Sequence, residues 1–174
     1  MRIQRSAVTA IRSFFCAIIL IAACTGCSRL HSYTLVSDEY GFSVTFPEKP
    51  VQTSDKNSQG LAKELWTVYP DGVNAFYSAQ ATSYNQQLPT GYWVPGQGVG
   101  EIAGIQLMES RRFKLRSAQS GREALAIATT ARSPSGGNIS SIYVIDGTKL
   151  ISVTARTDNE RDRSSFLQSL KLLR

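Results

Sequence analysis

Apolar and polar positions alternate along much of the chain after residue 32, and this alternation predicts β-strands. In residues 42–46, Phe42, Val44 and Phe46 share one side while the residues between them are polar, which is the period-2 pattern of a half-buried strand. The other segments that read as strands are 33–36, 61–69, 74–84, 112–118, 122–131, 138–145 and 149–154. Apolar residues occur without strict alternation in 142–145 and 150–153, which indicates central strands covered on both faces.

Turn residues separate these segments. The Pro-Asp-Gly sequence at 70–72 and the Asp-Gly sequence at 146–147 predict hairpins between the strands on either side. Pro47 and Pro50 end the strand before them, because proline has no backbone N–H to donate. The polar residues 52–60 that follow are expected to form a loop.

Two other segments show the helical period. Residues 99–109 predict a helix, although Gly104 lowers its helix propensity by about 1 kcal/mol relative to Ala. Its apolar side consists of Val99, Ile102, Ile105 and Met108.

The second predicted helix lies near residue 174. Thr157 and Glu160 have the spacing of a capping box, which would begin this helix. Its apolar stripe consists of Phe166, Leu167, Leu170 and Leu173. Many antiparallel strands, one helix in the middle and one at the end indicate the α+β class, an antiparallel sheet with helices packed against it in a single domain.

The first 23 residues have a different pattern. Arg2, Arg5 and Arg12 form a basic region, and the apolar stretch 14–23 follows it. That stretch suits a secretory signal and falls well short of the roughly 20 apolar residues that span a bilayer. We therefore expect a signal peptide over 1–23, a short tether over 24–32 and one folded domain over 33–174.

The signal peptide ends in Ile-Ala-Ala-Cys at 21–24, which resembles the bacterial lipoprotein signal. The resemblance implies a diacylglyceryl thioether on Cys24, cleavage before it and acylation of the new amine. Cys27 is the alternative lipidation site, weakened because its third upstream residue is Cys24 rather than an aliphatic one. An ordinary secretory peptide cut after Ala23 is the remaining alternative.

Charge and composition exclude several kinds of chemistry. All 13 acidic residues and 16 of the 19 basic residues follow residue 23, a net charge of +3 that is too small to indicate nucleic-acid binding. The predicted domain has no cysteine, and His31 in the tether is the only histidine. We therefore expect no disulfide, metal site or cofactor in the domain. Its carboxylates are too scattered along the sequence to suggest an acid/base pair, so an enzyme is not expected.

Several short motifs together resemble PsbP-like domains, the fold of the extrinsic photosystem II subunit, the Ran-binding Mog protein and many secreted bacterial proteins. The motifs are Tyr-Gly-Phe-Ser-Val-Thr-Phe-Pro at 40–47 with Pro50, Gly-Arg-Glu at 121–123, the hairpin 142–153 and Phe-Leu-Gln-Ser-Leu-Lys-Leu at 166–172. The resemblance covers about 33–173. It implies an α/β/α sandwich, flanked by helices, around an antiparallel sheet. Characterised members act by docking onto other proteins, and no catalytic residue carries over.

Two segments are candidate sites. The loop Gly91–Gly98 contains Tyr92, Trp93 and Val94, a typical anchor for a partner or ligand; the same aromatics could instead fold back onto the sheet. In the predicted strand 112–118, Arg112, Lys114 and Arg116 share one face. That face could contact anionic lipid headgroups, at about 1 kcal/mol per charge, or be simply solvated.

These features predict a non-enzymatic, membrane-anchored lipoprotein of the bacterial cell envelope that binds another envelope protein and aids its assembly or maintenance. The alternative is a carrier of a small ligand or lipid, with a pocket between sheet and helix under the Trp93 loop. A hydrolase using serine and carboxylate alone is least favoured. Thr25 follows the lipidation site in place of an aspartate, which favours an outer membrane facing the periplasm if the host has one.

Overall fold

The computed structural model describes residues 32–56, 60–70, 74–88, 106–133 and 136–173. The chain divides into two units between Leu30 and His31, so every described residue belongs to the second unit. The predicted signal peptide and the lipidation site, Cys24 or Cys27, lie outside the described residues and stay predictions. No helix in the described part of the chain is long and apolar enough to cross a membrane.

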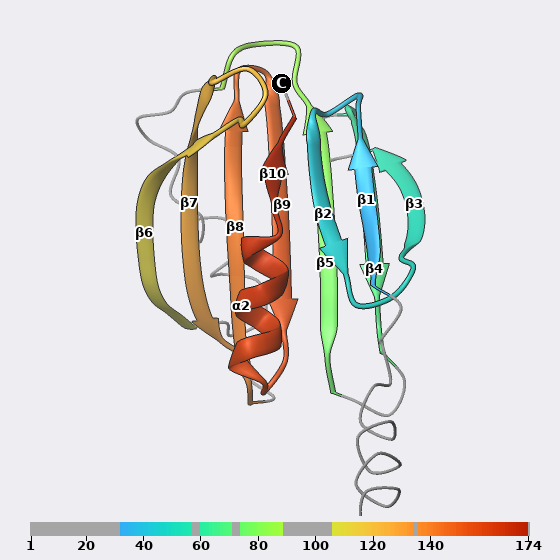
Figure 1. The fold of residues 1–174 in the computed structure, drawn as a ribbon, viewed down its shortest axis with the longest axis vertical. Coiled ribbons are helices and arrows are strands. Elements are labelled where there is room, and N and C mark those ends of the chain that lie inside the picture. Colours follow the sequence, from blue (N-terminus) through green and yellow to red (C-terminus); the bar gives the residue numbers. More distant parts are fainter. Residues whose placement is uncertain (1–31, 57–59, 71–73, 89–105, 134–135, 174) are drawn as a thin grey trace, which may run out of the picture. The chain divides into compact units, whose positions relative to one another are not determined.

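Most of the strands form one antiparallel sheet of seven strands, in the order β3-β4-β5-β9-β8-β7-β6 (Figure 1). Their bounds are β3 (Val51–Lys56), β4 (Ala62–Val68), β5 (Phe76–Ser83), β6 (Gln106–Arg116), β7 (Glu123–Arg132), β8 (Asn138–Asp146) and β9 (Lys149–Arg156). The hairpin predicted at Asp146-Gly147 is confirmed, since Asp146 pairs with Lys149 and Gly147 has a φ of 64°. Glycine adopts that left-handed conformation without the steric penalty of a side chain.

A smaller sheet of three strands brings distant parts of the sequence together. β1 (Tyr33–Ser37) and β2 (Phe42–Phe46) form a hairpin, and β10 (Lys171–Leu172) pairs with the other side of β2. The backbone N–H of Leu173 also donates to the carbonyl of Gly41 at 2.9 Å. The last described residues are thereby tied to the first hairpin of the domain.

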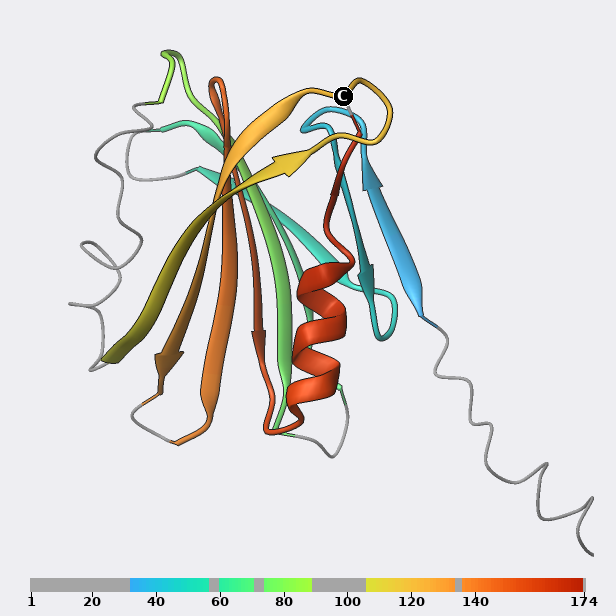
Figure 2. The same ribbon diagram turned by 60° about the vertical axis from the view of Figure 1, so that its left-hand side comes forward.

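The helix α2 (Glu160–Gln168) lies on the same side of the large sheet as the small sheet (Figure 2). Asn159 caps it, because the Asn159 side chain accepts hydrogen bonds from the backbone N–H groups of Arg161 and Asp162. The predicted capping box at Thr157 is therefore wrong. Thr157 lies two residues before the N-cap, and its hydroxyl accepts a hydrogen bond from the Asn159 N–H.

The core lies between the large sheet and the layer formed by α2 and the small sheet. That layer contributes large aromatic side chains, and the facing side of the large sheet contributes alanines, which leave room for the rings. The fully buried alanines are Ala79, Ala81, Ala126 and Ala155. Phe166 of α2 packs against Phe46 of the small sheet and Tyr77 of β5, with ring centroids 5.1 and 5.2 Å apart. These contacts join all three elements.

The expected α/β/α sandwich flanked by helices is wrong. The described residues are mostly antiparallel β-sheet, with the single helix α2 on one face. The helix predicted over 99–109 is contradicted over 106–109, where β6 begins; residues 99–105 lie outside the described residues. From Gln106 onward the segment pairs with β7, and these ladder hydrogen bonds override an apolar period that fitted a helix.

Two shorter strands also replace predicted structure. Residues 51–56, expected to be largely loop, form the edge strand β3, whose six residues are all exposed. Residues 171–172, expected to continue the last helix, form β10. Leu170 and Leu172 are buried in the core, so the apolar residues at this end serve a turn and a strand rather than one helical stripe.

Candidate functional site

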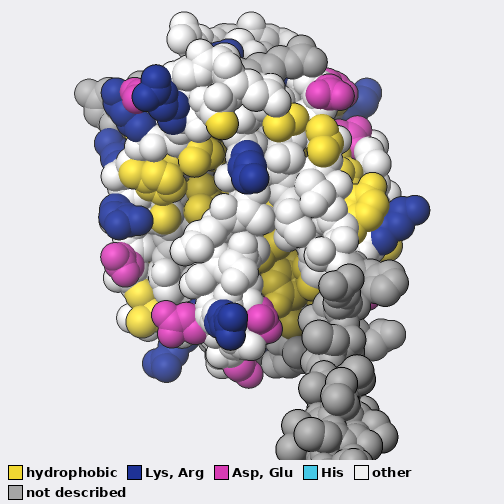
Figure 3. All heavy atoms as spheres, in the orientation of Figure 1, with side chains coloured by type: hydrophobic (Ala, Val, Ile, Leu, Met, Phe, Trp, Pro, Cys, Tyr) yellow, Lys and Arg dark blue, Asp and Glu magenta, His cyan; other side chains and the backbone are white. Residues whose placement is uncertain are grey.

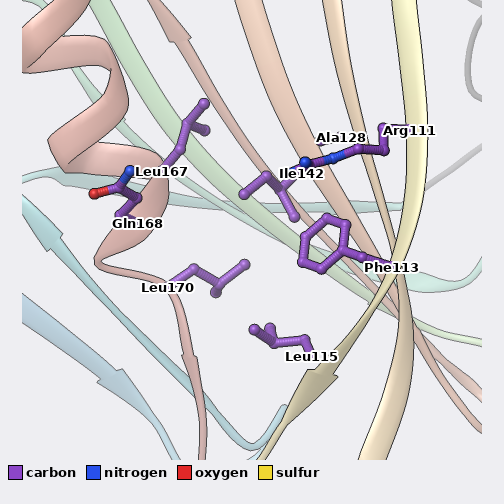
Figure 4. Close-up of a pocket in the computed structure, with 8 residues that line it drawn as sticks. All are labelled: Arg111, Phe113, Leu115, Ala128, Ile142, Leu167, Gln168 and Leu170. Atoms are coloured by element: carbon purple, nitrogen blue, oxygen red, sulfur yellow. The ribbon is translucent and has the colours of Figure 1, made fainter.

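A pocket of about 270 Å³ lies between the end of α2 and the β6–β7–β8 side of the large sheet. Figure 4 shows side chains from both elements converging on it. The residues that line it are Arg111, Phe113, Leu115, Ala128, Ile142, Leu167, Gln168 and Leu170. Six of these eight residues are apolar, and none is acidic.

Strand alternation sets the sheet side of the pocket. Every second residue of β6 points to the inner face of the sheet, so Arg111, Phe113 and Leu115 lie in one row. Their cross-strand partners on β7 are all alanines, Ala128, Ala126 and Ala124. Small partners leave open space beside the larger β6 side chains, which is why a hollow forms at this end of the sheet.

The turn after α2 sets the opposite wall. The helix ends at Gln168, and Ser169 follows as its C-cap. Leu167 and Leu170 then point toward the β6 row from either side of this turn, as Figure 4 shows. Figure 3 shows hydrophobic side chains at the surface on this face of the molecule, with Lys and Arg side chains near them.

Among the described residues that line the pocket, Arg111 is the only charged one. Its guanidinium carbon lies 5.8 Å from the centre of the Phe113 ring, a cation–π contact that holds the group near the apolar wall. Among the described carboxylates, none lies within salt-bridge distance of Arg111. Gln168 adds an amide that can donate or accept, so the polar atoms of the lining side chains come from two residues.

The lining determines which ligands suit the pocket. Among the described residues that line it, none has a carboxylate, hydroxyl or imidazole side chain. In the described part of the chain, no group of three or more His, Cys, Asp or Glu residues could hold a metal ion. An apolar wall with one cation at its edge suits a ligand with an apolar body and an anionic end.

The predicted membrane-contact residues lie on the other face of β6. Lys114 Nζ donates to Glu123 Oε2 at 2.8 Å, and Arg116 Nε donates to the carbonyl of Gly121 at 3.2 Å. The hydrogen bond and the opposite charge raise the pKa of Lys114 and lower the pKa of Glu123. Arg112 shares the face, but part of the basic charge there is thus already paired. Contact with headgroups stays a prediction.

The predicted aromatic loop with Tyr92, Trp93 and Val94 lies outside the described residues. The sequence did not predict a pocket at the residues that line it in the structure. The signal that could have found it was the alternation in 111–115, which places Arg111 with Phe113 and Leu115 instead of with Arg112 and Lys114.

A second surface surrounds the edge strand β3. In the described part of the chain, β3 pairs only with β4, so its other edge has no strand partner. Val51 on β3 is 65% exposed and Tyr69, just after β4, is 68% exposed. The Tyr69 ring packs against Phe76 of β5 with centroids 5.0 Å apart. This β3 edge, defined here as β3 with Tyr69, combines apolar side chains with an unpaired strand.

The described fold belongs to a class of domains in which an antiparallel sheet is covered on one face by a helix and a small sheet, and it is PsbP-like. The solution structure of cyanobacterial PsbP (CyanoP) from Synechocystis sp. PCC 6803 is similar to it, with a TM-score of 0.52 and 9% sequence identity over 84% of this chain and 95% of that chain. At this identity the similarity concerns the fold alone. No family model and no curated protein matches the sequence.

Proposed function

We propose that this protein is a non-enzymatic lipoprotein of the bacterial cell envelope whose domain binds another envelope protein. Acyl chains on Cys24, with Cys27 as the alternative, hold it on a membrane outside the cytoplasm. Two or three chains anchor a protein stably where a single chain does so only marginally. By binding this partner, the protein would aid the assembly or maintenance of an envelope component, at the outer membrane if the host has one.

The observation that carries the proposal is the β3 edge. A strand with an unpaired row of backbone N–H and C=O groups can receive an extended segment of another protein, and the main-chain hydrogen bonds supply affinity. The exposed Val51 and Tyr69 side chains add apolar area beside that row. The sequence resemblance to PsbP-like domains also supports binding of another protein, since it implies docking onto other proteins.

A photo-crosslinking experiment in living cells tests this proposal. A crosslinking amino acid at Thr53, on the exposed β3 strand, should yield a defined product with one envelope protein. The same amino acid at Ser165, an exposed position of α2, is the matched control and should not yield it. V51D combined with Y69D should remove the Thr53 product. Equal products from both positions, or a product that survives the double substitution, would contradict docking at the β3 edge.

The anchor is tested separately by mass spectrometry of the mature N-terminus. We expect acyl groups on Cys24, loss of membrane attachment in C24S and unchanged attachment in C27S. Acylation that persists in C24S and disappears in C27S would assign the anchor to the alternative site. An unmodified N-terminus on a protein free of membranes would overturn the lipoprotein proposal.

The second candidate function, carriage of a small ligand or lipid, is favoured by one observation. The pocket lies between the sheet and α2 and has an apolar lining. Both functions can coexist, because the pocket is formed by β6–β8 and the β3 edge lies at the opposite end of the strand order.

A further inference from the structure

We infer that the pocket between α2 and β6 binds a single-chain carboxylate, with its hydrocarbon tail among the leucines and its carboxylate on Arg111. This inference rests on the second candidate function, ligand carriage, and is independent of docking at the β3 edge. It assigns to the pocket one ligand class and one orientation.

The size of the pocket limits the ligand to one short chain. Its volume of about 270 Å³ is slightly below the range of about 300–1,000 Å³ that is usual for sites of drug-sized ligands. A two-chain lipid would leave most of its hydrocarbon outside. A single medium-length chain matches the volume.

The walls favour a hydrocarbon. Four apolar lining residues pack against the core and are only partly buried: Phe113, Leu115, Ile142 and Leu167. Their remaining exposed area is apolar, and covering it with a hydrocarbon chain is favourable by about 25 cal/mol per Å². None of the described lining residues is acidic, so a cationic ligand would find no carboxylate partner among them.

Arg111 favours a carboxylate at the end of that chain. Two other basic residues of this part of the sheet have carboxylate partners, Lys114 with Glu123 and Arg122 with Asp146. Arg111 instead has the Phe113 ring as its neighbour and no carboxylate within salt-bridge distance among the described residues. A guanidinium presents two parallel N–H donors, which a carboxylate accepts in a bidentate pair. Figure 4 shows the Arg111 side chain reaching from β6 toward Ile142 at the edge of the pocket.

Titration calorimetry tests the inference on the full chain carrying C24S and C27S, which has no acyl groups to compete for the pocket. The probes are decanoate, decanol and decylamine, which share a tail and differ in the charge of the head. We expect decanoate to bind most tightly and decylamine not to bind. Hexadecanoate should gain nothing over decanoate, because the extra carbons lie outside the pocket. Equal binding of decanoate and decylamine would overturn the inference.

Two arginine variants locate the carboxylate. R111Q should weaken decanoate binding by at least about tenfold, since it removes a charge-assisted pair. R112Q removes the same charge from the neighbouring residue of β6, whose side chain points to the other face, and should leave binding unchanged. Equal losses in both variants would show a diffuse charge effect and overturn the assignment.

A third variant locates the tail. A128F places a ring in the pocket floor and should abolish binding of decanoate and decanol alike. If A128F does not fold, L167W narrows the pocket from the helix side and should give the same result. Unchanged binding in the folded variant would overturn the site. Loss of decanoate binding while the Thr53 crosslink persists separates this inference from the docking proposal.

Discussion

The hydroxyl oxygen of Ser169 accepts a hydrogen bond from the backbone N–H of Thr45 at 2.9 Å. β10 pairs Lys171 with Ser43, so the same antiparallel register continued by two residues would place Ser169 opposite Thr45. At that point the chain is already the C-cap of α2. The Ser169 side chain therefore takes the place of a strand carbonyl, and the helix runs into β10 without leaving this donor of β2 unpaired.

Replacement of Ser169 should destabilise the domain. S169A removes the acceptor for the Thr45 N–H and also the hydrogen bond that the hydroxyl donates to the Phe166 carbonyl at 2.6 Å. A partly buried donor left without a partner costs about 1–3 kcal/mol of unfolding free energy. Urea denaturation measures this loss. S165A, at an exposed position of the same helix, should change the unfolding free energy little, and a similar loss in both variants would contradict the role of Ser169.

The aromatic contact between α2 and the two sheets should contribute more to the unfolding free energy than the Ser169 hydrogen bonds do. Phe166 is 4% exposed and touches both Phe46 and Tyr77, so F166A leaves a cavity where three elements meet. We expect a loss of about 3–5 kcal/mol in unfolding free energy. L107A, at a residue that is 41% exposed on β6, is the control. A loss below that of L107A would show that α2 contributes little to the fold.

Lys114 should control the pKa of Glu123. Because Lys114 lowers the pKa of Glu123, K114Q should move the pKa of the Glu123 carboxyl back toward its ordinary value. Since the folded pKa of Glu123 is the depressed one, the contribution of the pair is present at neutral pH and is lost as pH falls through that folded value. NMR titration of the Glu123 carboxyl carbon measures this shift. R112Q should shift it less than K114Q, and the reverse order would contradict the pairing.

Two tyrosines should make the domain sensitive to alkali. Burial raises the pKa of Tyr40 and of Tyr77, so the unfolded chain loses these phenolic protons at a lower pH than the folded protein. Stability is therefore complete below the unfolded pKa and falls as pH rises above about 10 toward the folded values. Y40F and Y77F should each lessen that fall, measured by urea denaturation at neutral and alkaline pH. L107A, at an exposed residue of β6 that does not titrate, should leave it unchanged.

Much of the fold was predictable because one apolar face marks the strands. The alternation at 42–46 predicted β2, and the Asp-Gly turn at 146–147 predicted the β8–β9 hairpin. Both are confirmed, although Ser43 on the expected polar side of β2 is also buried. β3 lacks that signal, because all six of its side chains are exposed and only its pairing with β4 defines it. β10 is two residues long and depends on β2, which is distant in the sequence.

The helix boundaries show the limit of local patterns. Thr157 and Asn159 can both cap a helix, and spacing to Glu160 favoured Thr157, whereas the structure uses Asn159. At the other end, Leu170 suited a helical stripe and instead lies in the turn after α2, and Leu172 lies in β10. The pocket was predictable only in part. Alternation in β6 fixes which side Arg111 faces, but the hollow depends on β7 alanines brought opposite by pairing.

The position of β2 between an early and a late strand affects how this domain forms during synthesis. β1 adjoins β2 as soon as both have emerged, but β10 follows more than a hundred residues later. Contacts this distant in sequence slow folding, because a long loop must close before they form. Until then neither α2 nor β10 covers Phe42, Val44 and Phe46. A newly made chain therefore exposes these apolar side chains, to which other proteins can bind. A holding chaperone would shield these side chains, and the domain would close only after residue 172 has been made.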